Sequence, residues 1–315
     1  MFNNYNDIKM EYERIRQQNV MKSIARKRML YERHPDLKMM DDKLLSLWVE
    51  IVKKGQNGED TGNVEKELSE LRQSRIEYLK KNNIKDDYRD VHYECNKCKD
   101  TGFVNGKKCS CYIDKEIQLY DTISNFRKYI ETDNFDNLKL SYYKQGDEKF
   151  SDTYYQYMEE KIKEIKSLVS NMETEPFNIM LRGIPGTGKT FLARCIGDMA
   201  LKLKKTVLYL NAVEYIDSLI QDYDGISLKQ FATKADLLIL DDLGVEYSSD
   251  FSKTAMNYVI DKRLNNNLST VITTNLIMEE DLTDRYLSPM CSRLLNMYKS
   301  IFLSGIDLRR LKNVK

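Results

Sequence analysis

One glycine-rich octapeptide has the residue types and spacing that bind a phosphate chain. The segment Gly183-Ile-Pro-Gly-Thr-Gly-Lys-Thr190 matches the pattern G-x-x-x-x-G-K-[ST] in full. Glycines let the backbone bend around phosphate oxygens, and the N-terminus of a following helix adds N–H donors. We expect Lys189 to reach the β- and γ-phosphates and the Thr190 hydroxyl to bind Mg²⁺. The other residues expected to line the phosphates are Gly183, Pro185, Gly186, Thr187 and Gly188.

The sequence on either side of the octapeptide fits the same function. A short apolar segment, Asn178–Arg182, precedes it and predicts a strand, and the segment Phe191–Leu203 predicts a helix. A strand before the loop and a helix after it are the context that this motif requires. A glycine-rich turn that matches by chance would not account for that context.

Two adjacent carboxylates follow the apolar run Leu237–Leu240. Such a run is typical of a central parallel strand that is buried on both faces. Carboxylates at the end of that strand should lie beside the phosphate loop, at the edge where α/β sheets bind ligands. We expect Asp241 to hold Mg²⁺, directly or through water, and Asp242 to act as base or orienting group for the attacking water. Without the phosphate loop, a polar strand end that caps a turn would be the simpler interpretation.

Three polar side chains further along the chain could complete the site. Asn275 follows a predicted strand and could orient water between Asp242 and the γ-phosphate; the alternative is an asparagine in a turn. Arg293 lies on a predicted helix before the last strand, and Arg309 lies just past that strand. A guanidinium from the same or a neighbouring subunit would offset the charge that develops on the γ-phosphate. Surface arginines are common, so the sequence alone decides neither assignment.

Four cysteines crowd into one short stretch, as Cys95-x-x-Cys98 and Cys109-x-Cys111. Four thiolates are enough for a tetrahedral Zn²⁺ site. Since the N-terminus lacks the features of a secretory signal, this pattern indicates metal binding before disulfides. A module this small could hardly build its own core, so the metal would stabilise its fold.

Two turns should bring the cysteine pairs together. Asp100-Thr-Gly102 predicts a turn beyond the first pair, and Asn105-Gly106 predicts a hairpin turn before the second. Free thiols and an iron–sulfur cluster are the alternatives to zinc. His92 is a reserve ligand, although a surface histidine is the simpler interpretation.

Length and composition limit the classes of protein that this chain could be. The 315 residues suggest two domains, or one large domain with an attachment. Their 41% hydrophobic and 31% charged residues fit a soluble globular protein. No apolar run approaches the roughly 20 residues that span a bilayer, so no membrane partner is expected. The N-terminus has no secretory signal, which favours the cytoplasm. The net charge of +1 argues against a protein that coats nucleic acid by bulk charge, although a local basic groove stays possible.

The periodicity predicts two kinds of architecture. The first ninety residues predict amphipathic helices, either a small helical domain or a bundle that docks a partner. A break is expected at His34-Pro35-Asp36, with Asp36 as a helix N-cap, and a loop over 55–62. After residue 177 strands and helices alternate, which is typical of a parallel α/β sheet. The expected strands are 178–182, 206–211, 237–240, 270–274 and 299–303, preceded by a helix over about 152–170.

Together these motifs resemble those of AAA+ ATPases, in the branch of the DnaC/DnaI-type loaders of replicative helicases. The cysteine-rich segment from Tyr93 to Cys111 resembles the module of the DnaI-like members. The resemblance covers most of the chain and rests on Gly183–Thr190, Leu240-Asp-Asp-Leu-Gly244, Thr273-Thr-Asn275, Ser292-Arg-Leu294 and Gly305–Arg309.

The resemblance implies a role for each site residue. Lys189 and Thr190 would be the Walker A residues, and Asp241 and Asp242 the Walker B residues. Many AAA+ proteins have Glu where Asp242 stands, so a weak, assembly-dependent ATPase is expected.

Asn275 matches the sensor-1 position and Arg309 the sensor-2 position. Arg293 matches the arginine finger that acts on a neighbouring subunit, which implies self-assembly with ATP.

The same resemblance implies the fold and the biology. The fold would be α/β, an AAA+ P-loop parallel sheet without a C-terminal lid, preceded by a helical N-terminal domain with a small zinc module. Residues 1–90 would bind the helicase, 91–131 would form the zinc module and linker, and 132–315 the ATPase domain. With ATP, Mg²⁺ and Zn²⁺ as cofactors, the protein would load a DnaB-type helicase onto single-stranded DNA during replication initiation.

Two other functions stay open at this point. An IstB-type transposition ATPase has a very similar core and would act on a transposase. A nucleotide-sensing adaptor would bind ATP without hydrolysing it. The cysteine module and the long helical N-terminus favour the loader.

Overall fold

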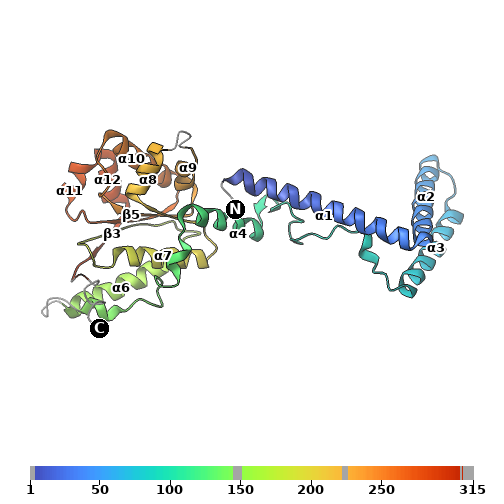
Figure 1. Ribbon diagram of the computed structural model, residues 1–315, viewed down its shortest axis with the longest axis horizontal. Coiled ribbons are helices and arrows are strands. Elements are labelled where there is room, and N and C mark those ends of the chain that lie inside the picture. Colours follow the sequence, from blue (N-terminus) through green and yellow to red (C-terminus); the bar gives the residue numbers. More distant parts are fainter. Residues whose placement is uncertain (1–3, 145–150, 222–225, 306, 308–315) are drawn as a thin grey trace. The chain divides into compact units, whose positions relative to one another are not determined.

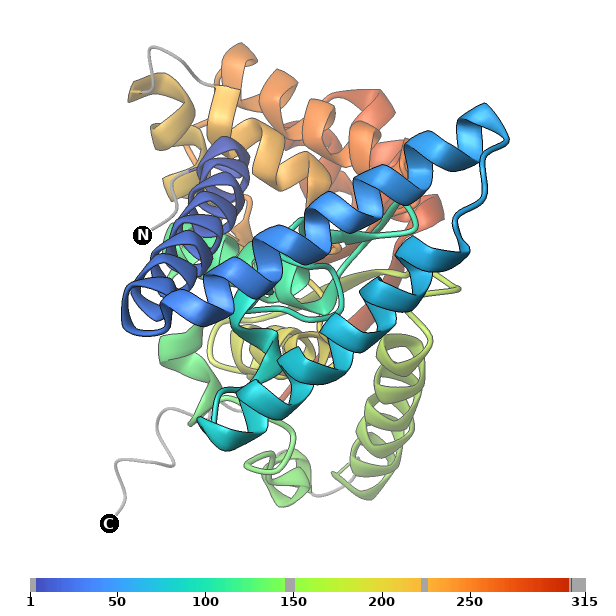
Figure 2. The same cartoon turned by 90° about the vertical axis from the view of Figure 1, so that its right-hand side faces the viewer.

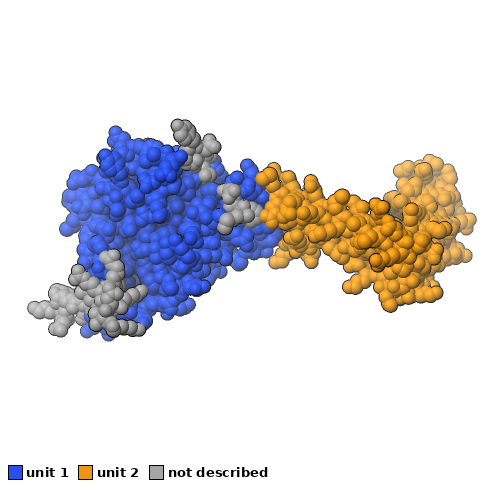
Figure 3. All heavy atoms as spheres, in the orientation of Figure 1, with its two compact units in different colours: residues 1–8, 110–315 blue, residues 9–109 orange. Residues whose placement is uncertain are grey.

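The computed structural model describes residues 4–144, 151–221, 226–305 and 307. By its internal contacts the chain divides into two compact units, residues 1–8 with 110–315 and residues 9–109 (Figure 3). The three segments that the sequence assigns to helicase binding, zinc binding and ATPase function remain predictions of role.

The unit of residues 9–109 consists of long helices followed by a small hairpin. Helices α2 and α3 pack side by side through Leu47, Val64 and Leu68 (Figure 2). The elements are α1 (Tyr5–Arg33), α2 (Pro35–Asn57), α3 (Gly62–Lys81), the 3₁₀ turn η1 (Asp86–Arg89), β1 (Phe103–Val104) and β2 (Lys107–Lys108). The hairpin expected at Asn105-Gly106 is confirmed, with both residues at positive φ between the two short strands.

Two expected boundaries in this unit are wrong. Helix α2 begins at Pro35, with His34 rather than Asp36 at the N-cap position. Proline suits the first helical position, because its φ is already helical and its missing N–H would have no partner there. The loop expected over 55–62 is shorter, because α2 continues to Asn57 and ends at Gly58, whose φ of 71° is left-handed.

The unit that contains residues 110–315 holds a five-stranded parallel sheet with helices on both faces (Figure 1). All five expected strands and the expected helix before them are present. The elements are α4 (Ser110–Ser124), α5 (Arg127–Ile130), η2 (Leu140–Lys144), α6 (Ser151–Ser170), β3 (Asn178–Gly183), α7 (Lys189–Lys202), β4 (Val207–Asn211), α8 (Ala212–Gln221), α9 (Ile226–Lys234), β5 (Leu237–Leu243), α10 (Asp250–Asn265), β6 (Ser269–Thr274), α11 (Glu279–Arg285), α12 (Ser288–Met297) and β7 (Lys299–Leu303).

The order of the strands brings the functional segments to one edge. The sheet runs β4-β5-β6-β3-β7, so β3 lies between β6 and β7, although it precedes both in sequence. All pairings are parallel, and the carboxyl ends of β3, β5 and β6 therefore lie at the same edge. This confirms the expected parallel α/β sheet preceded by a helical region. No described helix is long and apolar enough to cross a bilayer.

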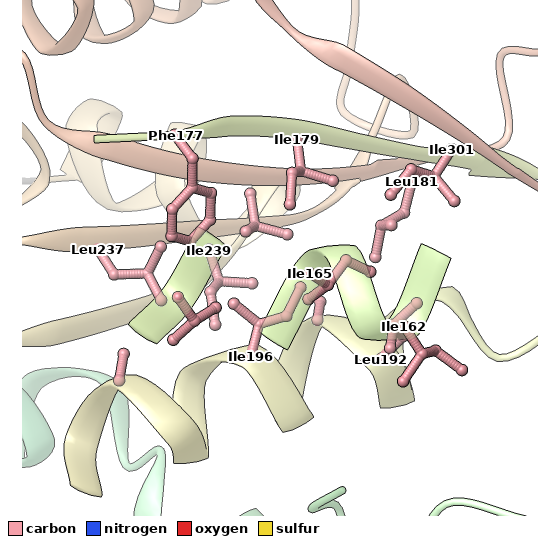
Figure 4. Close-up of a cluster of buried hydrophobic side chains, with 14 of the residues drawn as sticks. Ile162, Ile165, Phe177, Ile179, Leu181, Leu192, Ile196, Leu237, Ile239 and Ile301 are labelled. Carbon is pink, nitrogen blue, oxygen red and sulfur yellow. The ribbon is translucent and has the colours of Figure 1, made fainter. Parts of the chain in front are cut away.

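Apolar side chains on one face of the sheet hold α6 and α7 against it. Ile179, Leu181 and Ile239 point from the strands toward Leu192 and Ile196 on α7 (Figure 4). Each fully buried side chain of this size contributes roughly 1.5–3 kcal/mol to folding. The packing fixes the helix that begins at the phosphate loop.

Candidate nucleotide-binding site

The loop between β3 and α7 has a backbone that only glycine can supply at two positions. Gly186 has a φ of +85°, a conformation that L side chains rarely adopt. At Gly183 an added Cβ would lie 2.0 Å from the carbonyl oxygen of Leu303, so the loop passes directly against the end of β7. The expected glycine-bent phosphate loop is therefore present, with α7 beginning at Lys189.

The Lys189 ammonium lies within this loop. Its Nζ donates to the carbonyl oxygens of Gly183 (2.7 Å) and Ile184 (2.9 Å), and the residue is only 5% exposed. It also donates to Oδ1 of Asn275 at 2.8 Å. The structure thus brings together two residues that are 86 positions apart, as the sequence predicted for one site.

The Asp241 carboxylate is the second centre of the site. Its Oδ1 accepts hydrogen bonds from the hydroxyls of Thr190 (3.0 Å) and Thr273 (2.6 Å). Its Oδ2 accepts from the Tyr209 hydroxyl at 2.5 Å, and Asp241 is 3% exposed. Thr190 and Asp241 were expected to share Mg²⁺, and they lie in direct contact. A hydroxyl and a carboxylate are hard oxygen ligands of the kind that Mg²⁺ prefers, so these two residues fit the ion.

Thr273 and Tyr209 had no role in the sequence analysis. Thr273 stands in the Thr-Thr-Asn run, where it was noted only as part of a motif. Tyr209 lies between Leu208 and Leu210 in strand β4, and nothing in its sequence neighbourhood distinguishes it from a core residue.

Asp242 lies in a break of the β5–β6 register. The pairing shifts between Leu240 and Leu243, and Asp242 adopts a φ of +57°. Its backbone N–H donates to the Thr273 hydroxyl at 2.8 Å. Aspartate tolerates this left-handed conformation better than most residues, and the break turns its side chain away from the regular strand alternation.

The electrostatic surroundings of Asp242 suit a proton acceptor. Burial raises the pKa of its carboxyl group, and the charge of Asp241 raises it further, while Lys189 and Arg194 act in the opposite direction. A raised pKa brings a carboxylate closer to the working range of a general base. The base role expected for Asp242 remains a prediction, and these surroundings are consistent with it.

The two arginines of the predicted site have different outcomes. Arg293 donates to Oδ1 of Asp261 at 2.5 Å and to Oδ1 of Asn257 at 3.3 Å, both on α10. Its hydrogen bonds within the described residues therefore lead to α10 and not to the phosphate loop. Arg309 lies outside the described residues. A role for either arginine in catalysis stays a prediction.

The four clustered cysteines come together as expected. Their sulfur atoms lie within 4.8 Å of one another, with Cys98 and Cys109 buried. The sulfurs of Cys95 and Cys109 are 3.8 Å apart. Sulfurs that share a tetrahedral Zn²⁺ at about 2.3 Å lie roughly 3.8 Å apart. His92 is outside this group and instead contacts Asp87 and Arg26, so it is a surface histidine.

A buried aspartate that the sequence analysis assigned only to a turn organises the first cysteine pair. Asp100 is 1% exposed, and its carboxylate accepts from the backbone N–H groups of Cys95 (2.7 Å) and Glu94 (3.0 Å). It also accepts from the Asn19 side chain at 2.9 Å. Groups that orient ligands in this way stabilise metal sites. Its spacing of two residues after Cys98 could have signalled the role.

A comparison with protein families decides the class of the nucleotide site. The model described as IstB-like ATP binding protein matches residues 131–301, which is more than half of the chain. The chain belongs to the IstB-like ATP-binding proteins. This membership agrees with the phosphate loop, the Asp241 carboxylate and their position at one edge of the sheet.

Individual relatives of this IstB-like protein include helicase loaders. The uncharacterized protein YdaV of Escherichia coli K12 is 30% identical over 122 residues, 38% of this chain and 49% of the relative. The replicative helicase loader DnaC of Buchnera aphidicola is 26% identical over 159 residues, 49% of this chain and 59% of the relative. The chain thus spans about half the length of these curated relatives. A crystal structure of the DnaC helicase loader is 25% identical, with a TM-score of 0.43, and the match covers 47% of this chain and 90% of that one.

Replacing Lys189 by alanine should remove most of the ATP affinity and leave the fold intact. The ammonium is a charged donor, and hydrogen bonds of that kind contribute about 1.5–3 kcal/mol, which corresponds to a loss of roughly 10- to 150-fold. The measurement is a titration with a fluorescent ATP analogue, with thermal unfolding as the check on the fold.

Lys202→Ala is the matched control, because Lys202 lies on the same helix, is exposed and pairs with Asp198. The control should bind ATP like the wild type. Tight binding by a folded Lys189→Ala protein would refute the role assigned to Lys189.

Proposed function

We propose that this protein is an ATP-dependent loader that places a DnaB-type replicative helicase on single-stranded DNA during replication initiation. The proposal depends on the combination of two features in one chain. The first is a nucleotide site in which Lys189 contacts Asn275 and Thr190 contacts Asp241. The second is the four-cysteine cluster. Its family membership supports ATP binding, and relatives named as replicative helicase loaders support the choice of partner. Such a loader would work in the cytoplasm, on single-stranded DNA.

In this proposal ATP acts as a switch between assembly states. Asn275 and Asp242 would orient and activate the attacking water, and Mg²⁺ bound by Thr190 and Asp241 would offset charge on the phosphates. Arg293 would serve the active site of a neighbouring subunit. Its side chain keeps 28% exposure on α12, so it could exchange its contact with Asp261 for a phosphate across an interface.

The Arg293 assignment predicts that Arg293→Ala binds ATP normally but hydrolyses it more slowly in the assembled state. Loss of an arginine finger lowers the rate by roughly 10³-fold or more where the finger is essential. ATPase rates measured with helicase and single-stranded DNA present provide the test. An unchanged rate would place the finger elsewhere, and no turnover in the wild type would favour the nucleotide-sensing adaptor.

We assign the four cysteines to a structural Zn²⁺ ion. The assignment predicts about one zinc per chain, because four thiolates fill a tetrahedral site and leave no open position. Cys98→Ser should lose the metal and lower the unfolding temperature of residues 9–109. Cys291→Ser is the control, since Cys291 is buried outside the cluster. Metal analysis that finds iron and sulfide, or no metal, would refute the zinc assignment.

Helix α2 carries a surface that suits a partner protein. Leu45, Trp48, Val49 and Val52 are exposed at positions i, i+3, i+4 and i+7, so they form one stripe along the helix. We name these four residues the α2 stripe. A neighbouring side of the helix, with Leu44, Leu47 and Ile51, packs on α3, so the stripe is a second apolar face beside it. Helical spacing of this kind fits an amphipathic helix of a partner.

The charges beside the α2 stripe define the partner further. Leu45 and Trp48 line a groove of about 390 Å³ together with Arg72 and Arg89. Arg72 is exposed and forms no ion pair within the part of the chain that the structure describes. The two carboxylates in the groove, Asp41 and Asp86, are both paired with Arg75, and Asp41 also lies 3.5 Å from Arg89. We therefore propose that the helicase places an amphipathic helix with acidic residues in this groove.

A pull-down with a DnaB-type helicase tests both the partner and the surface. The wild type should bind the helicase, and binding should depend on ATP. Trp48→Ala should weaken the complex by about 10-fold or more, because exposed tryptophans at interface centres are frequent hot spots. Met39→Ala is the control, as Met39 is an exposed apolar residue of α2 outside the stripe.

The outcomes separate the hypotheses. No complex with the helicase in any nucleotide state would refute the loader, and capture of a transposase instead would favour the transposition ATPase. Equal binding by Trp48→Ala would refute the groove and leave the loader intact.

A further inference from the structure

Both oxygens of the Asp241 carboxylate accept hydrogen bonds, and one of the donors, Tyr209, lies outside the sequence motifs described above. Oδ1 accepts from Thr190 and Thr273, whereas Oδ2 accepts from the Tyr209 hydroxyl at 2.5 Å. Tyr209 is paired with Ile239 in the β4–β5 register, and Asp241 follows two residues later on the same face. Tyr209 and Asp241 thus lie on the same face of neighbouring strands, and the length of the tyrosine side chain spans the two-residue offset between them.

The direction of the tyrosine proton follows from its second partner. Nη2 of Arg194 donates to the Tyr209 hydroxyl at 2.8 Å. A guanidinium has donors only, so the hydroxyl must accept from Arg194 and give its single proton to Asp241.

Arg194 is itself held on two sides. Its Nη1 donates to Oδ2 of Asp133 at 3.0 Å, and its Cζ lies 3.6 Å from the ring centre of Tyr129. Arg194 follows Thr190 by about one helical turn on α7, so the two side chains lie on the same face of the helix. A cation that stacks on an aromatic ring and pairs with a carboxylate has little freedom to move.

We propose that Tyr209 and Arg194 are positioning residues for Mg²⁺, and that they act through Asp241. Donors on both oxygens fix the rotation of the carboxylate. Oδ1, which accepts from Thr190, would then be the oxygen available to hold the metal, directly or through water. Without the Tyr209 hydroxyl, Oδ2 would be buried with no hydrogen-bond donor from the described residues, and the carboxylate could turn away from Thr190. Hydrogen bonds that orient metal ligands in this way affect metal affinity by about 10- to 100-fold.

The contacts of Tyr209 and Arg194 connect the Asp241 carboxylate to the segment that contains Tyr129 and Asp133. Tyr129 and Asp133 lie just before and within the start of the region matched by the family model. Asp133→Asn would leave Arg194 in place but remove the charge that it pairs with. We expect a change in the same direction as for Tyr209→Phe, and a smaller one.

The inference rests on the proposed Mg²⁺ role of Asp241, and its test uses binding rather than turnover. Affinity for a fluorescent ATP analogue is measured across a Mg²⁺ titration and again in EDTA. Tyr209→Phe should need about 10- to 100-fold more Mg²⁺ for half-maximal enhancement, with EDTA affinity close to that of the wild type. Arg194→Met should shift the titration in the same direction.

Tyr215→Phe is the matched control for this experiment. Tyr215 is a buried tyrosine of the same unit, and its hydroxyl has no hydrogen-bond partner within the described residues. The control should follow the wild-type titration.

Three outcomes would overturn the proposal. A wild-type Mg²⁺ titration for folded Tyr209→Phe would refute the positioning role and leave ATP binding intact. An equal loss in EDTA would mean that Tyr209 shapes the nucleotide pocket or the fold. ATP binding that does not depend on Mg²⁺ in the wild type would refute the assignment of Mg²⁺ to Asp241. The positioning role of Tyr209 would then be refuted as well.

Discussion

The hydrogen bond between Thr190 and Asp241 joins the first turn of α7 to the end of β5, and the site depends on it. The two groups can meet only if the helix packs closely on the sheet. Gly197 permits this approach, because a Cβ at that position would lie 2.5 Å from Phe126 and 2.8 Å from Ile239. Buried apolar side chains on both elements then hold the helix in place. The position of the Thr190 hydroxyl thus depends on packing about two turns further along the helix.

The parts of this structure that could be predicted from the sequence are those with local signals. The octapeptide 183–190 carries its own backbone requirements, and an apolar run followed by Asp241 and Asp242 identifies a strand end. Alternating strands and helices then place these segments at one edge of a parallel sheet. Asn275 follows a predicted strand at the same edge, and the structure brings its side chain into contact with Lys189.

The features that were missed depend on contacts between distant residues. Tyr209 and Arg194 are 15 positions apart in the sequence. Only the register of β4 with β5 and the packing of α7 bring them to Asp241. Asp100 belongs to a predicted turn, but its burial depends on Asn19, which is 81 residues away. The start of α2 was misplaced for a local reason, because the preference of proline for the first helical position outweighed the capping tendency of Asp36.

A triphosphate and Mg²⁺ are expected to occupy the loop between Lys189 and Asp241. The most direct test is an experimental structure of the full chain with Mg²⁺ and a non-hydrolysable ATP analogue. Phosphate oxygens should lie within hydrogen-bonding distance of the Lys189 ammonium, and Mg²⁺ should lie about 2.1 Å from the Thr190 hydroxyl oxygen. An empty loop, or a nucleotide bound elsewhere on the chain, would contradict this expectation.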